Sequence, residues 1–136
     1  MIDLEMANRL LAVARAATTR AYAPYSNFQV GAAALTADGT VFAGSNVENA
    51  SFPMTVCAER VAVNSAIAAG HREIHAVAVT AARRQGVTPC GGCRQVLNEF
   101  KPKTGDLIVV LEGGDRPEIV PLQHLLPRSF GPADLD

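Results

Sequence analysis

Three stretches of the chain repeat apolar residues at helical spacing, and each predicts a helix. Asp3 is suited to cap the start of the first, and the Ala23-Pro24 pair would end it. The second is apolar on nearly every side, so we expect it to be buried. The three helices are expected from residue 3 to about 21, from Pro53 or Thr55 to Gly70, and from 89 to about 100.

Apolar runs outside these helices predict strands. A turn at Ala37-Asp38-Gly39 would join the first two strands into a hairpin. The run from Ile74 to Thr80 is apolar throughout, as in a central strand. The strands are expected over residues 28–36, 40–45, 74–80, 107–111 and 118–121, with one helical turn over 122–126. This order of elements predicts an α/β fold in which helices pack on a mixed sheet.

The composition fits a single folded domain over residues 1–136. Hydrophobic residues make up 49% and charged residues 18%, which argues against disorder. The formal net charge of -1 argues against a long nucleic acid as partner. Residues 1–5 lack the pattern of a signal peptide, and no apolar stretch has transmembrane length. We therefore expect a cytoplasmic protein with reduced cysteines and no membrane partner.

All three cysteines lie in two short motifs, each at the start of a predicted helix. The motifs are Cys57-Ala58-Glu59-Arg60 and Pro89-Cys90-Gly91-Gly92-Cys93-Arg94-Gln95. Cys90 and Cys93 are three residues apart, so on a helix both sulfurs reach one ion. Helix N-termini also favour the thiolate form that binds metal. With Cys57 as third ligand and no obvious fourth, the motifs predict a catalytic Zn²⁺ site with an open position for water.

Glu59 turns this metal site into an enzyme hypothesis, because the activated water needs a group that takes up its proton. On an ideal helix Cys57 and Glu59 would point about 200° apart. Both can serve one site only if that site lies off the end of the helix, which we expect. Three thiolates leave a zinc centre negative, so Arg60, and Arg94 as a second candidate, would offset the charge by donating hydrogen bonds to sulfur.

Other interpretations of the same residues exist. A closed structural zinc site would need His71, His75 or His124 as fourth ligand. Cys-x-x-Cys is also a redox motif. Glu59 and Arg60 alone would be ordinary surface residues.

With these motifs the chain resembles the cytidine deaminases of the small, homotetrameric, three-cysteine zinc class. The resemblance extends to residues 22–33, 46–50 and 125–135, and so covers nearly the whole chain. It implies a three-layer deaminase fold and one Zn²⁺ per subunit. It also implies hydrolytic deamination of cytidine and 2'-deoxycytidine to the uridine nucleosides and ammonia, a reaction of pyrimidine salvage.

The resemblance also implies residue roles. Glu59 would be the proton shuttle, and the backbone of Ala58 would bind the pyrimidine edge. Asn46 and Glu48 would bind the ribose. The aromatic roles are Phe28 packed against the base, Phe130 reaching into a neighbouring subunit's site, and Tyr25 at a subunit contact near the site. The alternatives are a solvated Glu48 and core positions for Phe28 and Phe130.

The chain departs from the family pattern in two places: Phe52 stands where Tyr is common, and Gly91-Gly92 replaces Gly-Ala, which should loosen the helix start. Two rivals remain. Blasticidin-S deaminase resembles the chain in its zinc motifs and length, and a zinc-stabilised binding module would lack activity. Editing of polynucleotides is disfavoured, because aromatic residues make up only 5% and there is no Trp for base stacking.

Overall fold

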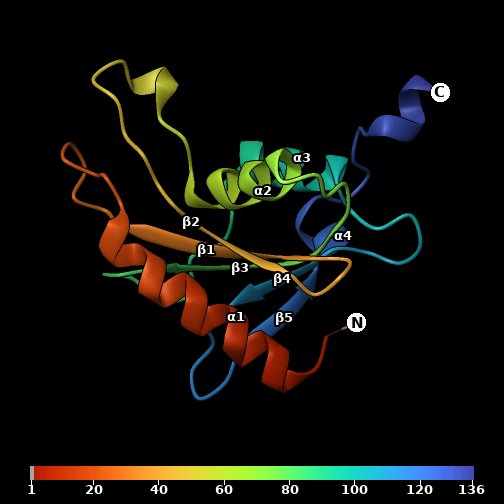
Figure 1. The fold of residues 1–136 in the computed structure, drawn as a ribbon, viewed down its shortest axis with the longest axis horizontal. Helices are drawn as coiled ribbons and strands as arrows, with labels where there is room; N and C mark the ends of the chain where they lie inside the picture. Colours follow the sequence, from red (N-terminus) through yellow and green to blue (C-terminus); the bar gives the residue numbers. More distant parts are fainter. Residues whose placement is uncertain (1) are drawn as a thin grey trace.

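The computed structural model describes residues 2–136 and shows a five-stranded sheet with helices on both faces (Figure 1). The strand order is β2-β1-β3-β4-β5, and among these five strands β3 and β4 form the one parallel pair. The main elements are α1 (Leu4–Ala17), β1 (Val30–Thr36), β2 (Val41–Ser45), α2 (Ala58–Ala68), β3 (Ile74–Ala81), α3 (Gly91–Glu99), β4 (Ile108–Leu111), β5 (Glu118–Pro121) and α4 (Leu122–Leu125). The predicted mixed sheet is confirmed.

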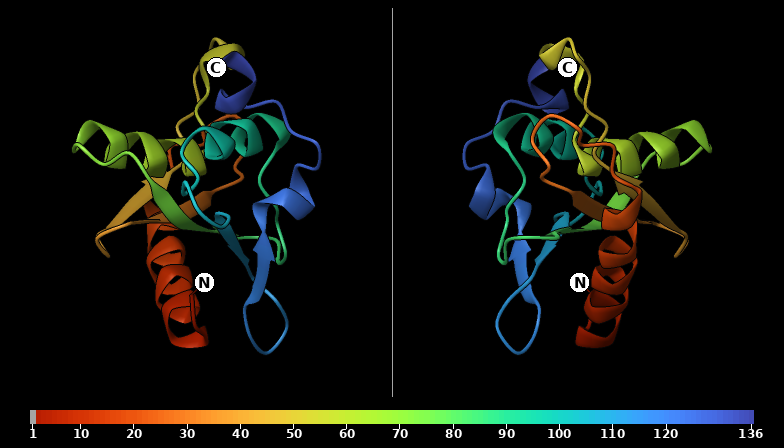
Figure 2. Two further views of the ribbon diagram at one scale, coloured as in Figure 1. Left: turned by 90° about the vertical axis from the view of Figure 1, so that its right-hand side faces the viewer. Right: turned by 90° about the vertical axis from the view of Figure 1, so that its left-hand side faces the viewer.

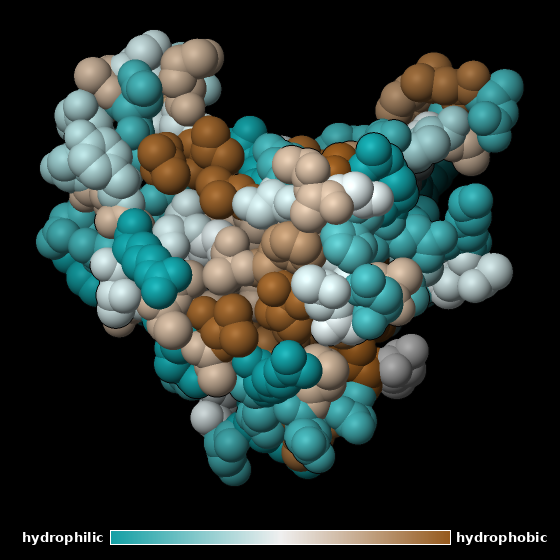
Figure 3. All heavy atoms as spheres, in the orientation of Figure 1, coloured by the Kyte–Doolittle hydropathy of each residue, from teal (hydrophilic) through white to brown (hydrophobic). Residues whose placement is uncertain are grey.

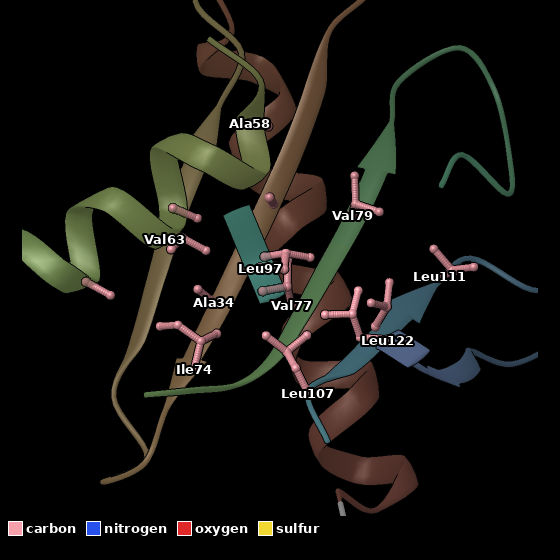
Figure 4. Close-up of a cluster of buried hydrophobic side chains, with 14 residues drawn as sticks. Ala34, Ala58, Val63, Ile74, Val77, Val79, Leu97, Leu107, Leu111 and Leu122 are labelled. Atoms are coloured by element: carbon pink, nitrogen blue, oxygen red, sulfur yellow. The ribbon is translucent and has the colours of Figure 1, made fainter. Parts of the chain in front are cut away.

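Alternating side chains along the strands build two cores, one on each face of the sheet. On β1, Ala33 and Leu35 face α1, whereas Ala32 and Ala34 face the other helices. The face opposite α1 is covered by α2, α3 and α4, whose buried residues meet those of β3 and β4 (Figures 2 and 4). The molecule therefore has three layers, as the resemblance implied.

Glycines allow the helices to approach the sheet closely. A Cβ on Gly44 of β2 would lie 2.4 Å from both the Ala58 carbonyl oxygen and the Ala62 nitrogen of α2. Contacts this short do not occur in real structures, so this position requires the absence of a side chain. The close contact fixes the first turn of α2, which follows Cys57, against the sheet.

Gly44→Ala is expected to destabilise the protein by roughly 1–3 kcal/mol or more, because α2 must move to make room for the methyl group. Thermal unfolding of the purified variant measures the change. Gly114→Ala is the matched control, since a Cβ there meets nothing within 4 Å. Equal unfolding temperatures for the two variants would contradict this account of the packing.

The start of the second helix differs from the sequence prediction. The helix begins at Ala58, not at Pro53 or Thr55, and residues Phe52–Met54 form a separate 3₁₀ turn. The cause is a pair of backbone hydrogen bonds between Val47 and Val56, each 2.9 Å long, which hold the chain extended up to Cys57. Cys57 is consequently the N-cap residue and lies outside the helix.

The other differences are smaller. The first helix ends at Ala17, with a 3₁₀ turn at Thr18–Arg20, because the Thr18 hydroxyl donates to the Arg15 carbonyl and tightens the last turn. A 3₁₀ turn at Pro132–Leu135 was not predicted. The remaining boundaries lie within two residues of expectation. In the described residues 2–136, no helix has the length and apolar character needed to cross a membrane.

Candidate active site

The three cysteine sulfurs come together where the N-termini of α2 and α3 meet. Cys57 is the N-cap of α2, Cys90 is the N-cap of α3, and Cys93 lies in the first turn of α3. The Cys57–Cys90 sulfur distance is 3.9 Å, the Cys90–Cys93 distance is 3.4 Å, and all three lie within 4.8 Å of one another. Sulfurs 2.3 Å from one tetrahedral zinc ion would be roughly 3.8 Å apart. The cluster therefore fits zinc.

Within residues 2–136 no histidine or carboxylate joins this cluster. His71 lies against Asp38 and Phe42, and His75 lies 3.4 Å from Glu73. His124 is an exposed residue of α4. The alternative of a structural zinc site closed by a histidine is therefore wrong for this chain, and three sulfurs leave a fourth position for water or substrate.

The surroundings of the sulfurs favour thiolate at Cys57. A hydrogen bond from the Cys93 thiol and the adjacent Arg60 guanidinium hold the pKa of the Cys57 thiol well below its usual range, although burial opposes them. The same bond to Cys57, together with burial, raises the pKa of Cys93. This arrangement therefore favours the thiolate form at Cys57 over that at Cys93.

The two arginines of the motifs have different contacts. Arg60 Nη2 lies 3.6 Å from the Cys57 sulfur, as predicted for a residue that offsets the thiolate charge. Its buried Nε finds no hydrogen-bond acceptor among residues 2–136. Arg94 makes no hydrogen bond to a cysteine sulfur in the described part of the chain; its guanidinium donates instead to backbone carbonyls and to a threonine hydroxyl. Arg94 was therefore wrong as a candidate for direct charge compensation.

A cavity of about 430 Å³ opens beside the cysteines, a volume within the usual range for small-molecule sites. Its lining includes Cys57, Cys90 and Glu59, so Cys57 and Glu59 do serve one space. Cys57 precedes the helix, which removes the conflict of direction expected for two helical positions. Glu59 is only 4% exposed, and burial, reinforced by the charge of Cys57, raises the pKa of its carboxyl to about 7. It is therefore not an ordinary surface glutamate.

Asn46 and Glu48 also line this cavity. The Asn46 amide accepts a hydrogen bond from the Val30 N–H (2.9 Å) and donates one to the Phe28 carbonyl (2.8 Å). Because an amide carries two N–H donors, one donor is left for a ligand. Asn46 thus also fixes the segment that carries Phe28, a structural role that the sequence did not reveal.

Comparison with known proteins shows which protein family this site belongs to. Residues 4–110 match the family model described as the cytidine and deoxycytidylate deaminase zinc-binding region. The chain belongs to this deaminase family. It is 46% identical to a cytidine deaminase of Halalkalibacterium halodurans over 85% of this chain and 87% of that one. It is 42% identical to one of Sporosarcina psychrophila over 93% of each chain.

Solved structures agree with the assignment to the deaminase family. The crystal structure of cytidine deaminase from Burkholderia pseudomallei superposes with a TM-score of 0.82 at 46% identity, over 90% of this chain and 98% of that one. Zinc is the cofactor of the matching family region, and the three-cysteine cluster could hold it.

Glu48 shows how this deaminase chain shapes its cavity, and it reveals a residue that sequence reasoning missed. The Glu48 carboxylate accepts hydrogen bonds from the backbone N–H groups of Tyr25 (2.9 Å) and Ser26 (3.2 Å), and from the Ser26 hydroxyl. The Ser26 bond is the main cause that lowers the pKa of Glu48. Ser26 Oγ also accepts from the Phe28 N–H at 3.0 Å. A serine two residues after Pro24, in a turn, was the available signal.

The remaining site candidates of the deaminase fall into two groups, those that line the cavity and those that do not. Phe28 is half-buried and lines the cavity, as does Ala58, whose N–H at the start of α2 has no acceptor within the helix. Tyr25 and Phe130 do not line it. Tyr25 is 52% exposed and packs edge-on against Phe52, and Phe130 is 60% exposed, so its ring is not in the chain's own core.

Proposed function

We propose that this protein hydrolyses cytidine and 2'-deoxycytidine to the corresponding uridine nucleosides and ammonia, as an enzyme of pyrimidine salvage. One observation carries the proposal: two of the three clustered thiols, Cys57 and Cys90, and the buried Glu59 line the same nucleoside-sized cavity. The names of the relatives support cytidine as substrate. In this proposal residues 1–136 form one zinc-dependent nucleoside deaminase domain.

Cys57, Cys90 and Cys93 would hold the zinc ion, one per subunit, and Arg60 would offset their charge at Cys57. Bound zinc supplies a Lewis acid that lowers the pKa of water in the open position. Two helix N-termini at the cluster add positive partial charge, which stabilises the three thiolates.

Glu59 would move the protons of the reaction. It takes a proton from the attacking water and delivers it to ring N3, which makes C4 electrophilic. The water oxygen then bonds to C4. Glu59 next transfers the proton of the new hydroxyl to the amino group, and the C4–N bond breaks to release ammonia. A carboxyl with a pKa of about 7 is suited to both steps, because it accepts and returns a proton at neutral pH.

The walls of the cavity would orient the nucleoside. Phe28 would pack against the base, and the backbone of Ala58 would bind its polar edge. Asn46 and Glu48 would bind the ribose, chiefly its 3'-hydroxyl, with the amide donor and carboxylate lone pairs that their own contacts leave free. Such a site rejects analogues that lack the hydroxyl, because its polar groups would be left unpaired.

Glu48→Gln is expected to raise KM for cytidine by about 10- to 100-fold, the usual worth of a hydrogen bond to a charged group. The substitution also weakens the hydrogen bonds from the backbone N–H groups of Tyr25 and Ser26, so this part of the cavity lining becomes less ordered. Steady-state kinetics with cytidine and 3'-deoxycytidine provide the check. An unchanged preference for cytidine over the 3'-deoxy compound would rule out Glu48 as the ribose ligand.

We also infer that the protein is a homotetramer in the cytoplasm. Large apolar side chains are exposed at the surface: Phe52 is 69% exposed, and Tyr25 and Phe130 are more than half exposed. The 3₁₀ turn at Phe52–Met54 and the C-terminal tail form two separate projections of the molecule (Figure 3). Neighbouring subunits would cover these surfaces, and Phe130 would enter a neighbour's site with Tyr25 at the contact. Three thiol ligands also suit a reducing compartment.

Mixing two impaired variants tests the shared site. Phe130→Ala alone is expected to raise KM several-fold, and Glu59→Gln alone to lower kcat by about 100-fold or more. In mixed tetramers, a site with an intact Glu59 can receive Phe130 from a Glu59→Gln neighbour, so part of the activity should regain the wild-type KM. Native mass spectrometry shows whether the tetramers have mixed, because the Phe130→Ala subunit is lighter than the Glu59→Gln subunit. If KM in the mixture stays at the Phe130→Ala value, Phe130 does not act across the interface.

A substrate panel tests the function itself. Purified zinc-loaded protein is incubated with cytidine, 2'-deoxycytidine, blasticidin S and a cytosine-containing oligonucleotide, and products are separated by chromatography. We expect turnover of both nucleosides and neither of the other compounds. Turnover of blasticidin S alone would replace the nucleoside assignment, and turnover of none would favour a zinc-stabilised binding module.

A further inference from the structure

Arg94 joins three separate segments of the chain at the second cysteine motif. From the first turn of α3, its Nε donates to the Pro89 carbonyl at 2.8 Å and its Nη1 to the Leu125 carbonyl at 2.7 Å. Its Nη2 donates to the Thr88 hydroxyl at 3.2 Å. The guanidinium therefore fastens the loop before α3, and α3 itself, to the end of α4.

Arg94 also forms hydrogen bonds to the backbone on both sides of the Cys90 α-carbon. The backbone N–H of Arg94 donates to the Cys90 carbonyl at 3.0 Å, while its side chain holds the Pro89 carbonyl. Both peptide groups that flank the Cys90 α-carbon are thus bonded to one residue. Cys90 itself is exposed, lies outside the helix in an extended conformation, and makes no capping bond with its thiol. Its side chain depends on these two carbonyls for its direction.

The start of α3 is weak without this contact. Its first two residues are Gly91 and Gly92, and the position of a Cβ on either meets nothing within 4 Å. Glycine costs up to about 1 kcal/mol relative to alanine in a helix, because it loses the most backbone entropy. The two thiols of Cys90 and Cys93 lie on either side of this glycine pair and need another constraint to hold their 3.4 Å separation.

We propose that Arg94 is a positioning residue for the metal: it holds the Cys90 backbone so that Cys90 and Cys93 are arranged for zinc before zinc arrives. Its role differs from that of Arg60, which contacts a sulfur. Ligands ordered during folding lose less entropy when the metal binds, so the affinity for zinc is higher. The inference rests on the zinc site of the proposed function but not on its substrate.

Zinc affinity of Arg94→Gln tests the inference in the full-length protein. Competition with a chromogenic chelator should show zinc binding weakened by roughly 10- to 100-fold, the usual effect of losing a residue behind the ligands. The absorption spectrum of the Co²⁺-loaded variant should also change, because its thiolate bands depend on ligand geometry. Unchanged zinc affinity and an unchanged cobalt spectrum would overturn the proposal.

Arg72→Gln is the matched control. Arg72 Nη1 donates to the carbonyls of Ile67 (3.0 Å) and His71 (2.7 Å), at the opposite end of α2 from Cys57. The control removes the same kind of contact but away from the zinc ligands. It should therefore leave zinc affinity within about twofold of wild type, a much smaller change than is expected when a residue that supports a ligand is lost. If both variants weaken zinc binding equally, the effect is one of general stability and the proposal is overturned.

A second substitution checks the mechanism. Gly92→Ala in the Arg94→Gln background should recover part of the zinc affinity, because alanine stiffens the helix start without a clash. If this double variant recovers no zinc affinity, the weak helix start does not have the proposed role.

If Arg94→Gln does not fold, Arg94→Lys replaces it. Lysine keeps the positive charge but cannot donate to all three acceptors as the guanidinium does, so wild-type zinc affinity in this variant would also overturn the proposal. Because zinc binding is measured without nucleoside, a protein that binds zinc normally yet leaves cytidine intact would refute the proposed function alone.

Discussion

Glu59→Gln is expected to lower kcat for cytidine by about 100- to 10,000-fold, the usual contribution of a general acid and base. Glutamine has nearly the same shape, but its amide neither takes up nor returns a proton. The carboxyl is almost fully buried beside the thiol cluster and has a raised pKa, so solvent has little access to replace it as a proton carrier. Stopped and continuous absorbance assays with cytidine measure the loss.

Zinc content separates loss of proton transfer from loss of metal in this variant. Glu59 is not part of the thiol cluster, so Glu59→Gln should retain one zinc per subunit and unfold at nearly the wild-type temperature. Glu99→Gln, at an exposed position on α3, is the control for loss of a carboxylate as such. A Glu59→Gln enzyme that keeps a tenth or more of wild-type kcat would show that another group moves the protons.

Cys57→Ala should have an effect of comparable size by another route. The substitution removes one of the three sulfurs, the one whose thiol pKa its neighbours hold below its usual range. Zinc affinity should fall by more than the roughly 10- to 100-fold that a residue behind the ligands costs. Activity should then equal that of wild-type protein treated with a chelator, and added zinc should restore only the wild type.

Thermal unfolding gives an independent check of the same prediction. Metal that binds the folded chain stabilises it by mass action, so zinc should raise the unfolding temperature of the wild type. The Cys57→Ala variant should show little or no rise at the same zinc concentration. Stoichiometric zinc in the variant, together with an unchanged rise, would mean that Cys57 is not a ligand.

The sequence predicted the elements and the chemistry of this site better than its local geometry. Apolar patterning predicted each helix and strand, and the longest of them, such as α1 and β3, are long enough for the pattern to repeat. The position of Cys57 was missed: its place before α2 depends on the pairing of Val47 with Val56, two residues far from any repeating pattern. That pairing is what lets Cys57 and Glu59 face one cavity.

Polar contacts between loops were the other part that could not be predicted. The Glu48 contacts to Tyr25 and Ser26 join positions more than twenty residues apart, and the Asn46 amide is bonded to the backbone of β1 and of the segment before it. Composition and spacing carry no signal for such pairs. For Arg94, the negative charge of three thiolates suggested a sulfur contact, but its side chain turns back to the Pro89 carbonyl.

The central claim is that this chain deaminates cytidine by hydrolysis, with zinc bound by its own cysteines. The most direct test incubates zinc-loaded protein with cytidine and quantifies uridine and ammonia together, beside a chelator-treated sample. We expect the two products in equal amounts from the zinc-loaded protein and neither from the treated one. Protein with one zinc per subunit that forms neither uridine nor ammonia would contradict the account.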